Sequence, residues 1–117
     1  IKSEPSSVNL SVNSFDVEQN FGSEVTLNAT IQNMDGQKVS NGAKARFRDV
    51  FEDGSPVNGR FREEKLSSNN ESIVSAIYSP GMVELGQEIT IIIELLDNEE
   101  NLLGISDNKK LVVTSND

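Results

Sequence analysis

The sequence predicts an all-β fold, a sandwich of about seven strands. Three observations predict this fold: short runs of alternating apolar and polar residues, turn-forming dipeptides about every ten residues, and no stretch with the apolar spacing of an amphipathic helix. Together they are typical of an immunoglobulin-like β-sandwich. A barrel of the oligonucleotide-binding type is the alternative. No internal repeat is visible, so residues 1–117 are predicted to form one domain, with residues 1–7 as a linker.

Residues 86–97 are predicted to form the central strand. Apolar side chains at every second position place one face of an extended chain in the core, namely Ile89, Ile91, Ile93 and Leu95. A helical face would also fit the spacing of three and four residues between Ile89, Ile92, Ile93 and Leu96. Three features favour a strand: the run is short, isoleucine and threonine are stiff at χ1, and Gly86 and Asp97 mark turns at its ends.

The other predicted strands follow the same alternation. The first covers residues 8–12 and continues through 15–17 after a kink at 13–14. The next are residues 24–31, 43–48, a short stretch around 61, and 73–78. The last strand has two parts, 102–105 and 111–114, and is broken around 106–108. The side chains predicted to face inward on two of these strands are Val25, Leu27, Ala29 and Ile31, and Val74, Ala76 and Tyr78. An odd number of up-and-down strands predicts that the termini lie at opposite ends.

Composition excludes several classes of function. A formal net charge of −9 argues against a nucleic-acid partner, since phosphate binding needs a basic face. No run approaches the roughly 18 apolar residues of a membrane span, so no membrane insertion is expected. The chain has no His and no Cys, which excludes Ser–His and Cys–His nucleophile systems.

Acidic residues are the remaining candidates for chemistry. A carboxylate pair could act as in glycosidases, but the acids fall in turns and on outward strand positions, so no catalytic residue and no cofactor are predicted. Residues 97–101 and 49–53 offer oxygen ligands suited to calcium. Neither segment has the spacing of a helix-flanked calcium loop, and acidic side chains commonly cap their own turns. The prediction is therefore no metal.

Aromatic residues point to one candidate contact surface. Phe15, Phe47 and Phe61 fall at alternating positions and are predicted to be core residues. Phe21 and Phe51 lie in turn regions and are the candidates for contact with a partner, although a ring tucked under its own loop is the simpler arrangement. The absence of Trp leaves little material for a sugar-binding platform.

Basic residues are concentrated in one part of the chain. Seven of the ten lie between Lys38 and Lys65. The outward row of Arg46 and Arg48 is predicted to lie beside an outward row of Glu88 and Glu94, because the third and penultimate strands of such a sandwich are neighbours. Cross-strand pairing of this kind would use the positive charge internally. Docking of a polyanion is the alternative.

Three segments resemble bacterial immunoglobulin-like domains of the invasin and intimin type. Residues 27–47 (LNATIQNMDGQKVSNGAKARF) are similar to that family's strand, turn and returning strand, residues 72–81 (SIVSAIYSPG) to its alternating strand with a small-residue turn, and residues 86–96 to a strand of its last hairpin. Two positions depart from the family pattern: Lys38 stands where the family has Pro, and Asn70-Glu71 where it has Asp-Gly. Macroglobulin-type domains are a second candidate family.

The resemblance implies a non-catalytic structural spacer or adhesion module of a multidomain bacterial surface or secreted protein, located outside the cell or at its surface. The expected partners are neighbouring domains of the same chain, and a host or cell-surface protein or glycan. Two alternatives stay open: a ligand-binding module for carbohydrate or protein, and an accessory domain of an extracellular enzyme.

Overall fold

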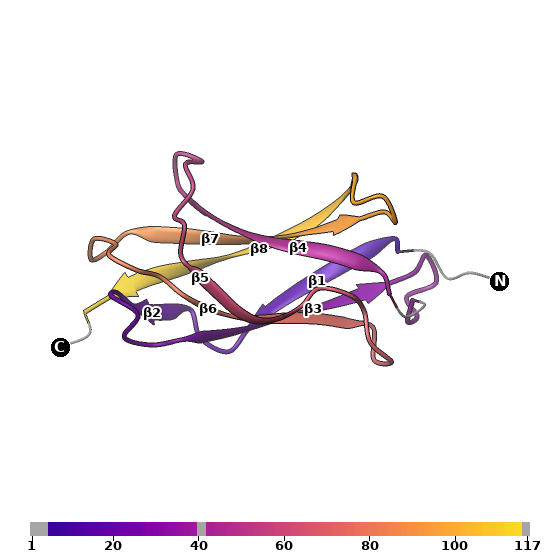
Figure 1. Ribbon diagram of the computed structural model, residues 1–117, viewed down its shortest axis with the longest axis horizontal. Helices are drawn as coiled ribbons and strands as arrows, with labels where there is room; N and C mark the ends of the chain where they lie inside the picture. The colour runs from indigo at the N-terminus through magenta and orange to yellow at the C-terminus, as the bar shows by residue number, and fades with distance from the viewer. Residues whose placement is uncertain (1–4, 40–41, 116–117) are drawn as a thin grey trace.

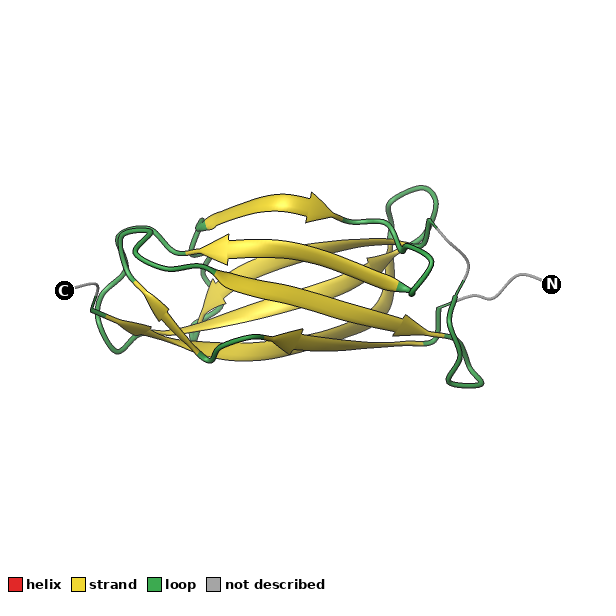
Figure 2. Ribbon diagram, turned by 90° about the horizontal axis from the view of Figure 1, so that it is seen from below, coloured by secondary structure: helices red, strands yellow, loops and turns green. Residues whose placement is uncertain are grey.

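Two four-stranded sheets face each other in the computed structural model, which describes residues 5–39 and 42–115. Figures 1 and 2 show the two layers and the elongated outline. The first sheet has the order β1 (Ser7–Val12), β3 (Val25–Gln32), β6 (Ile73–Ser79) and β5 (Arg60–Lys65). The second has the order β2 (Asp16–Glu18), β8 (Leu102–Thr114), β7 (Glu88–Leu96) and β4 (Lys44–Phe51). The described residues thus form an all-β, immunoglobulin-like sandwich, which confirms the predicted fold class.

The first run of chain is divided between the sheets. β1 pairs antiparallel with β3, and β2 pairs parallel with β8. The change of sheet occurs at the predicted kink, where the Ser14 hydroxyl accepts from the Asp16 backbone N–H and the Asn13 side chain accepts from the Thr26 N–H. The seven predicted runs therefore correspond to eight strands.

The core lies between the sheets and follows the predicted alternation. β7 lies between β8 and β4, and its inward side chains are fully buried, which confirms the predicted central strand; it covers Glu88–Leu96 of the expected residues 86–97. Burying each such side chain contributes roughly 1.5–3 kcal/mol. The inward faces predicted for β3 and β6 are also confirmed; their buried residues are Val25, Leu27, Ala29, Ile31, Val74, Ala76 and Tyr78.

Two expectations about individual positions were wrong. Phe15 is 59% exposed, because it precedes β2 at the change of sheet, where the alternation that would bury it is interrupted. The last strand is continuous through residues 106–108. Its irregularity lies closer to the β7–β8 turn, between the pairs Glu94↔Ser106 and Leu96↔Leu102, where Gly104 has φ 79°. A positive φ of this kind is readily adopted by glycine in a bulge.

The two ends of the fold lie far apart. β1 begins at one end of the long axis and β8 ends at the other, as Figure 1 shows, which confirms the predicted placement. The domain measures 52 × 25 × 21 Å along its principal axes. Among the described residues no helix is suited by length and hydropathy to cross a membrane.

Candidate contact surface

The turn between β2 and β3 has an unusual backbone. Gly22 N–H donates to Gln19 O at 3.0 Å, which closes a tight turn. Its two central residues, Asn20 and Phe21, have φ of 55° and 57°. Positive φ at both centres is the signature of a type I′ turn, in which Asn is common and a bulky aromatic residue is strained. Contacts with the rest of the fold must therefore hold Phe21 in this conformation.

Those contacts come from the β6–β7 connection. Asn20 N–H donates to Gly81 O at 2.8 Å, and Phe21 N–H donates to Pro80 O at 2.9 Å. A Cβ on Gly81 would lie 3.1 Å from Phe21 Cζ, so the glycine lets the ring approach closely. We call residues 19–22 together with Pro80 and Gly81 the Phe21 turn.

The Phe21 ring is half exposed and has a cation above it. Its exposed fraction is 46%, and the Arg60 guanidinium carbon lies 4.2 Å from the ring centroid. A cation–π contact at an exposed site is worth roughly 0.5–1 kcal/mol. Met82, next to the Phe21 turn, is 93% exposed. The surface at the Phe21 turn thus combines an aromatic ring with the Arg60 guanidinium, and an exposed thioether follows Gly81 in the chain.

Phe51 occupies a different setting at the end of β4. Its N–H donates to Ser55 O at 2.9 Å, and its half-buried ring packs against the core. It lines a shallow open depression with Glu52, Asp53 and Gln87. The Ser55 hydroxyl and N–H both donate to the Asp53 carboxylate and lower the pKa of that group. The surroundings of Phe51 are therefore acidic, whereas those of Phe21 are cationic.

No described contact joins the two rings, so Phe21 and Phe51 lie in separate environments. Their role as a contact surface stays a prediction. Phe21 carries the stronger case, because it combines exposure with a strained backbone and a positioned cation.

Two acidic side chains considered as calcium ligands, Asp49 and Asp97, accept hydrogen bonds from groups of the fold. Asp49 lies within β4 and is buried. Asp97 caps its own turn, since its Oδ1 accepts from Glu99 N–H at 2.8 Å and Asn101 N–H at 2.9 Å. Within residues 5–39 and 42–115 no three acidic side chains gather in a group that could hold a metal ion.

Asp49 belongs to a buried polar cluster that was not predicted from the sequence. Its Oδ2 accepts from the Tyr78 hydroxyl at 2.8 Å and from Gly59 N–H at 2.7 Å. Burial of the phenol, together with this carboxylate, raises the pKa of Tyr78. The available signal was the phase of β4, because Asp49 continues the inward series of Ala45 and Phe47.

An aromatic stack lies next to this cluster and bridges the two sheets. The Phe61 ring centroid is 4.8 Å from that of Tyr78 and 6.2 Å from that of Phe47. Contacts of this kind are worth about 0.5–1.5 kcal/mol beyond area burial. The stack secures β5 of the first sheet against β4 of the second.

The predicted pairing of the arginine row is confirmed in its main part. Arg46 lies opposite Glu94 in the β4–β7 register, and Glu94 Oε1 accepts from Arg46 Nε at 2.9 Å and from Arg48 Nε at 2.8 Å. Glu88 was wrongly placed in this row. It pairs with Val112 of β8, and the β4–β7 ladder ends one residue before reaching it, at Phe51↔Ile89.

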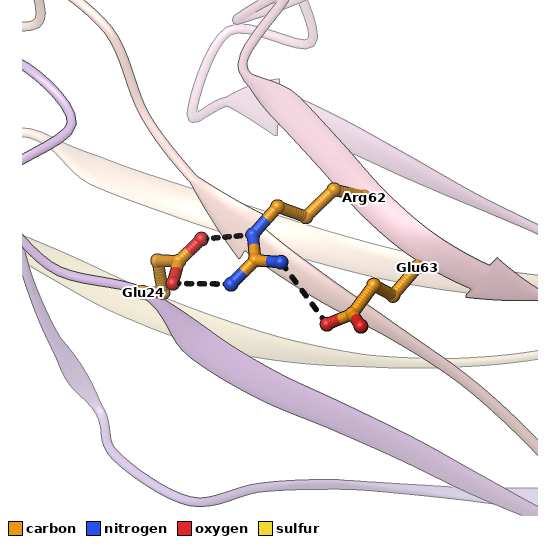
Figure 3. Close-up of polar contacts among 3 residues, drawn as sticks. All are labelled: Glu24, Arg62 and Glu63. Carbon is orange, nitrogen blue, oxygen red and sulfur yellow. Dashed lines mark hydrogen bonds and ion pairs between the residues drawn. The ribbon is translucent and has the colours of Figure 1, made fainter.

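A second ion-pair group lies on the first sheet, shown in Figure 3. Arg62 of β5 donates to both carboxylate oxygens of Glu24, the residue directly before β3, through its Nε and one terminal nitrogen. It also pairs with Glu63 at 3.0 Å. The hydrogen bond from Arg62 lowers the pKa of Glu24. Arg46, Arg48, Arg60 and Arg62 therefore all have partners within the domain.

Comparison with known proteins finds similarity in structure and none in sequence family. No protein-family model matches the chain, and no curated protein matches it by sequence. Its structure is similar to that of the Yersinia pseudotuberculosis adhesin InvE, with a TM-score of 0.65 and 13% identity over 94% of this chain. It is also similar to domains 4 and 5 of the S-layer protein SbsC, with a TM-score of 0.57 and 16% identity over 98% of this chain. The chain corresponds to 32% of the adhesin and 49% of the S-layer structure.

Proposed function

We propose that this chain is a non-catalytic structural spacer or adhesion module of a multidomain bacterial surface or secreted protein, related to the invasin and intimin type. Its action would be mechanical: a cooperatively folded unit holds a binding tip away from the surface to which the protein is attached. The neighbouring domains of the same chain would be its constant partners, and its location would be extracellular or at the cell surface.

One observation carries the proposal. The chain enters the sandwich at one end of its 52 Å long axis and leaves at the other. Modules joined in this way extend end to end, so each copy adds nearly its full length. A domain whose first and last strands ended at the same pole would fold the chain back on itself.

Further support comes from the two structural neighbours. One is an adhesin and the other an S-layer protein, and in both the matching region is a fraction of a longer chain. A module of a surface protein is consistent with both. The net charge of −9 and the internal pairing of four arginines also fit a soluble, weakly interacting exterior.

The proposal is tested with arrays of one, two and four copies joined head to tail, residue 117 of one copy to residue 1 of the next. Small-angle X-ray scattering should show a maximum dimension that grows by about 50 Å per added copy, following the long axis. A control array has a flexible Gly/Ser linker of about 20 residues between copies, so that its dimension grows with the wider spread of a random coil. A four-copy array no longer than a two-copy array would overturn the spacer role.

The Phe21 turn favours a second candidate function, the binding of a protein or glycan. A half-exposed aromatic ring beneath a guanidinium resembles the anchors found at protein interfaces, where Tyr, Trp and Arg are enriched. Binding to glycan and surface-protein panels should be compared for the wild type, Phe21→Ala and Phe51→Ala. Loss of a binding signal in Phe21→Ala alone would favour this function. No signal from the wild type would count against it.

A further inference from the structure

The first and last strands of the domain run side by side and in the same direction. β1 and β2 follow one another, and β2 is parallel to β8. Force that separates the two ends of the chain would therefore draw β1–β2 toward one pole and β8 toward the other (Figure 1). Contacts between these strands would be sheared along their length instead of being opened one at a time.

Both strands have an open edge along most of their length. Asn13, directly after β1, donates its N–H to Thr26 O, and N–H groups alternate in direction along a strand. The odd-numbered residues of β1 therefore point their N–H groups toward β3, and the even-numbered residues point theirs outward. On β8, Val113 N–H donates to Gln87 O on the β7 side, so even-numbered residues point outward. β2 covers that edge of β8 only at residues 112–114.

Asp107 connects the two open edges. Its Oδ2 accepts from the outward N–H of Leu10 on β1 at 2.8 Å, and its Oδ1 accepts from the outward N–H of Asn108 on β8 at 2.9 Å. One carboxylate thus satisfies a donor on each sheet. An inward-pointing charge at a strand edge also discourages the edge from pairing with another chain.

We propose that Asp107 is a clip that joins the first and last strands and resists force applied between the two ends of the chain. It acts with the short β2–β8 ladder, in which Val112 N–H donates to Phe15 O at 2.9 Å and Gln19 N–H donates to Thr114 O at 3.1 Å. The biological meaning of the clip rests on the proposed spacer function. Its mechanical effect does not rest on that function. A pulling experiment that contradicts the clip and an array-length experiment that contradicts the spacer are therefore separate outcomes.

Single-molecule pulling of the 117-residue chain at constant force tests the clip. With handles on the two ends of the chain, Asp107→Ala is expected to raise the unfolding rate about tenfold, because charge-assisted hydrogen bonds are lost before the transition state is reached. Asp107→Asn keeps one acceptor oxygen and should give a smaller rise. It also serves as the test variant if Asp107→Ala does not fold.

Ser72→Ala is the matched control. The Ser72 hydroxyl also joins two backbone segments, accepting from Val39 N–H at 2.9 Å and donating to Ile31 O at 2.6 Å, but neither belongs to the terminal strands. Its unfolding rate under the same force should change less than about threefold, since load on the terminal strands does not pass directly through its contacts with Val39 and Ile31. An equal rise of the unfolding rate in Ser72→Ala would contradict the proposed role of Asp107. So would an unchanged unfolding rate in both Asp107→Ala and Asp107→Asn.

Changing the direction of force adds a second check. The chain has no cysteine, so Asp35→Cys and Asp53→Cys place handles uniquely in the turns before and after β4. Along this direction the load bypasses the terminal strands, and Asp107→Ala should alter the unfolding rate less than about twofold. A tenfold rise here as well would show a general loss of stability and would contradict the proposal.

Discussion

The hydroxyl of Tyr78 on β6 donates a hydrogen bond to the carboxylate of Asp49 on β4, across the interior of the sandwich, at 2.8 Å. Both side chains are buried, and the same carboxylate oxygen accepts from Gly59 N–H. No basic side chain takes part in the contacts described at this carboxylate. The burial of the Asp49 carboxylate is therefore compensated by two neutral donors from other segments of the chain, the Tyr78 hydroxyl and the Gly59 N–H.

The first prediction concerns this pair. Tyr78→Phe should lower the free energy of unfolding by about 1–3 kcal/mol, because it removes a donor from a buried carboxylate and leaves the packing nearly unchanged. Chemical denaturation measures the loss. A double-mutant cycle with Asp49→Asn should give a coupling energy of at least about 0.5 kcal/mol. Strict additivity of the two substitutions would contradict a direct interaction.

The second prediction concerns alkaline pH. The pKa of Tyr78 is raised above its ordinary value of 10.0, mainly by burial and then by Asp49. Its contribution to stability is therefore fully present below pH 10 and is lost as pH rises toward the folded-state value. Above pH 10 the unfolding free energy of the wild type should fall more steeply than that of Tyr78→Phe, by up to about 1.4 kcal/mol per pH unit.

Spectroscopy offers an independent reading of the same titration. The chain contains one tyrosine, so the ultraviolet absorbance of tyrosinate reports Tyr78 alone. Ionisation should coincide with unfolding in a pH titration. Appearance of tyrosinate near pH 10 in a chain that remains folded would contradict the buried hydrogen bond.

The third prediction concerns the acid side and Glu24. Its pKa is lowered from 4.5 chiefly by the hydrogen bond from Arg62, so the stabilisation is present above pH 4.5 and is lost as pH falls through the folded-state value. The difference in melting temperature between the wild type and Glu24→Gln should shrink across that range. Glu64→Gln, an exposed change on β5 at a position with no described ion pair, is the control and should show no such convergence.

The fourth prediction compares adjacent residues of β7. Ile91 points inward and is fully buried, whereas Ile92 points to the outer face and is half-buried. Ile91→Ala should destabilise the domain by about 2–5 kcal/mol, because it removes buried methylene groups and leaves a cavity. Ile92→Ala should cost about 1 kcal/mol. Equal losses in denaturant unfolding would place the wrong face of the strand in the core.

Strands and their faces could be predicted from local sequence because the side-chain period of a strand is two. Ile89 to Leu95 alternates over a single short stretch, and each side chain goes to the core or away from it by position alone. The neighbouring placement of Arg46 and Glu94 could be predicted in the same way, once the fold class supplied the order of strands. Phe15 departed from the rule because the chain changes sheet beside it.

The sequence by itself thus determined an all-β sandwich, its inward faces, the kink at residues 13–14 and the separation of its ends. Tertiary structure decided the partners of individual polar groups. Leu10 and Asp107 are 97 positions apart in the chain, and the Tyr78–Asp49 pair spans 29. Similarly, the half-exposed position of Phe21 depends on Gly81 and Arg60. Alternation constrains only the direction of a side chain from its own backbone, whereas a hydrogen bond also requires the packing of two distant segments to bring donor and acceptor within about 3 Å.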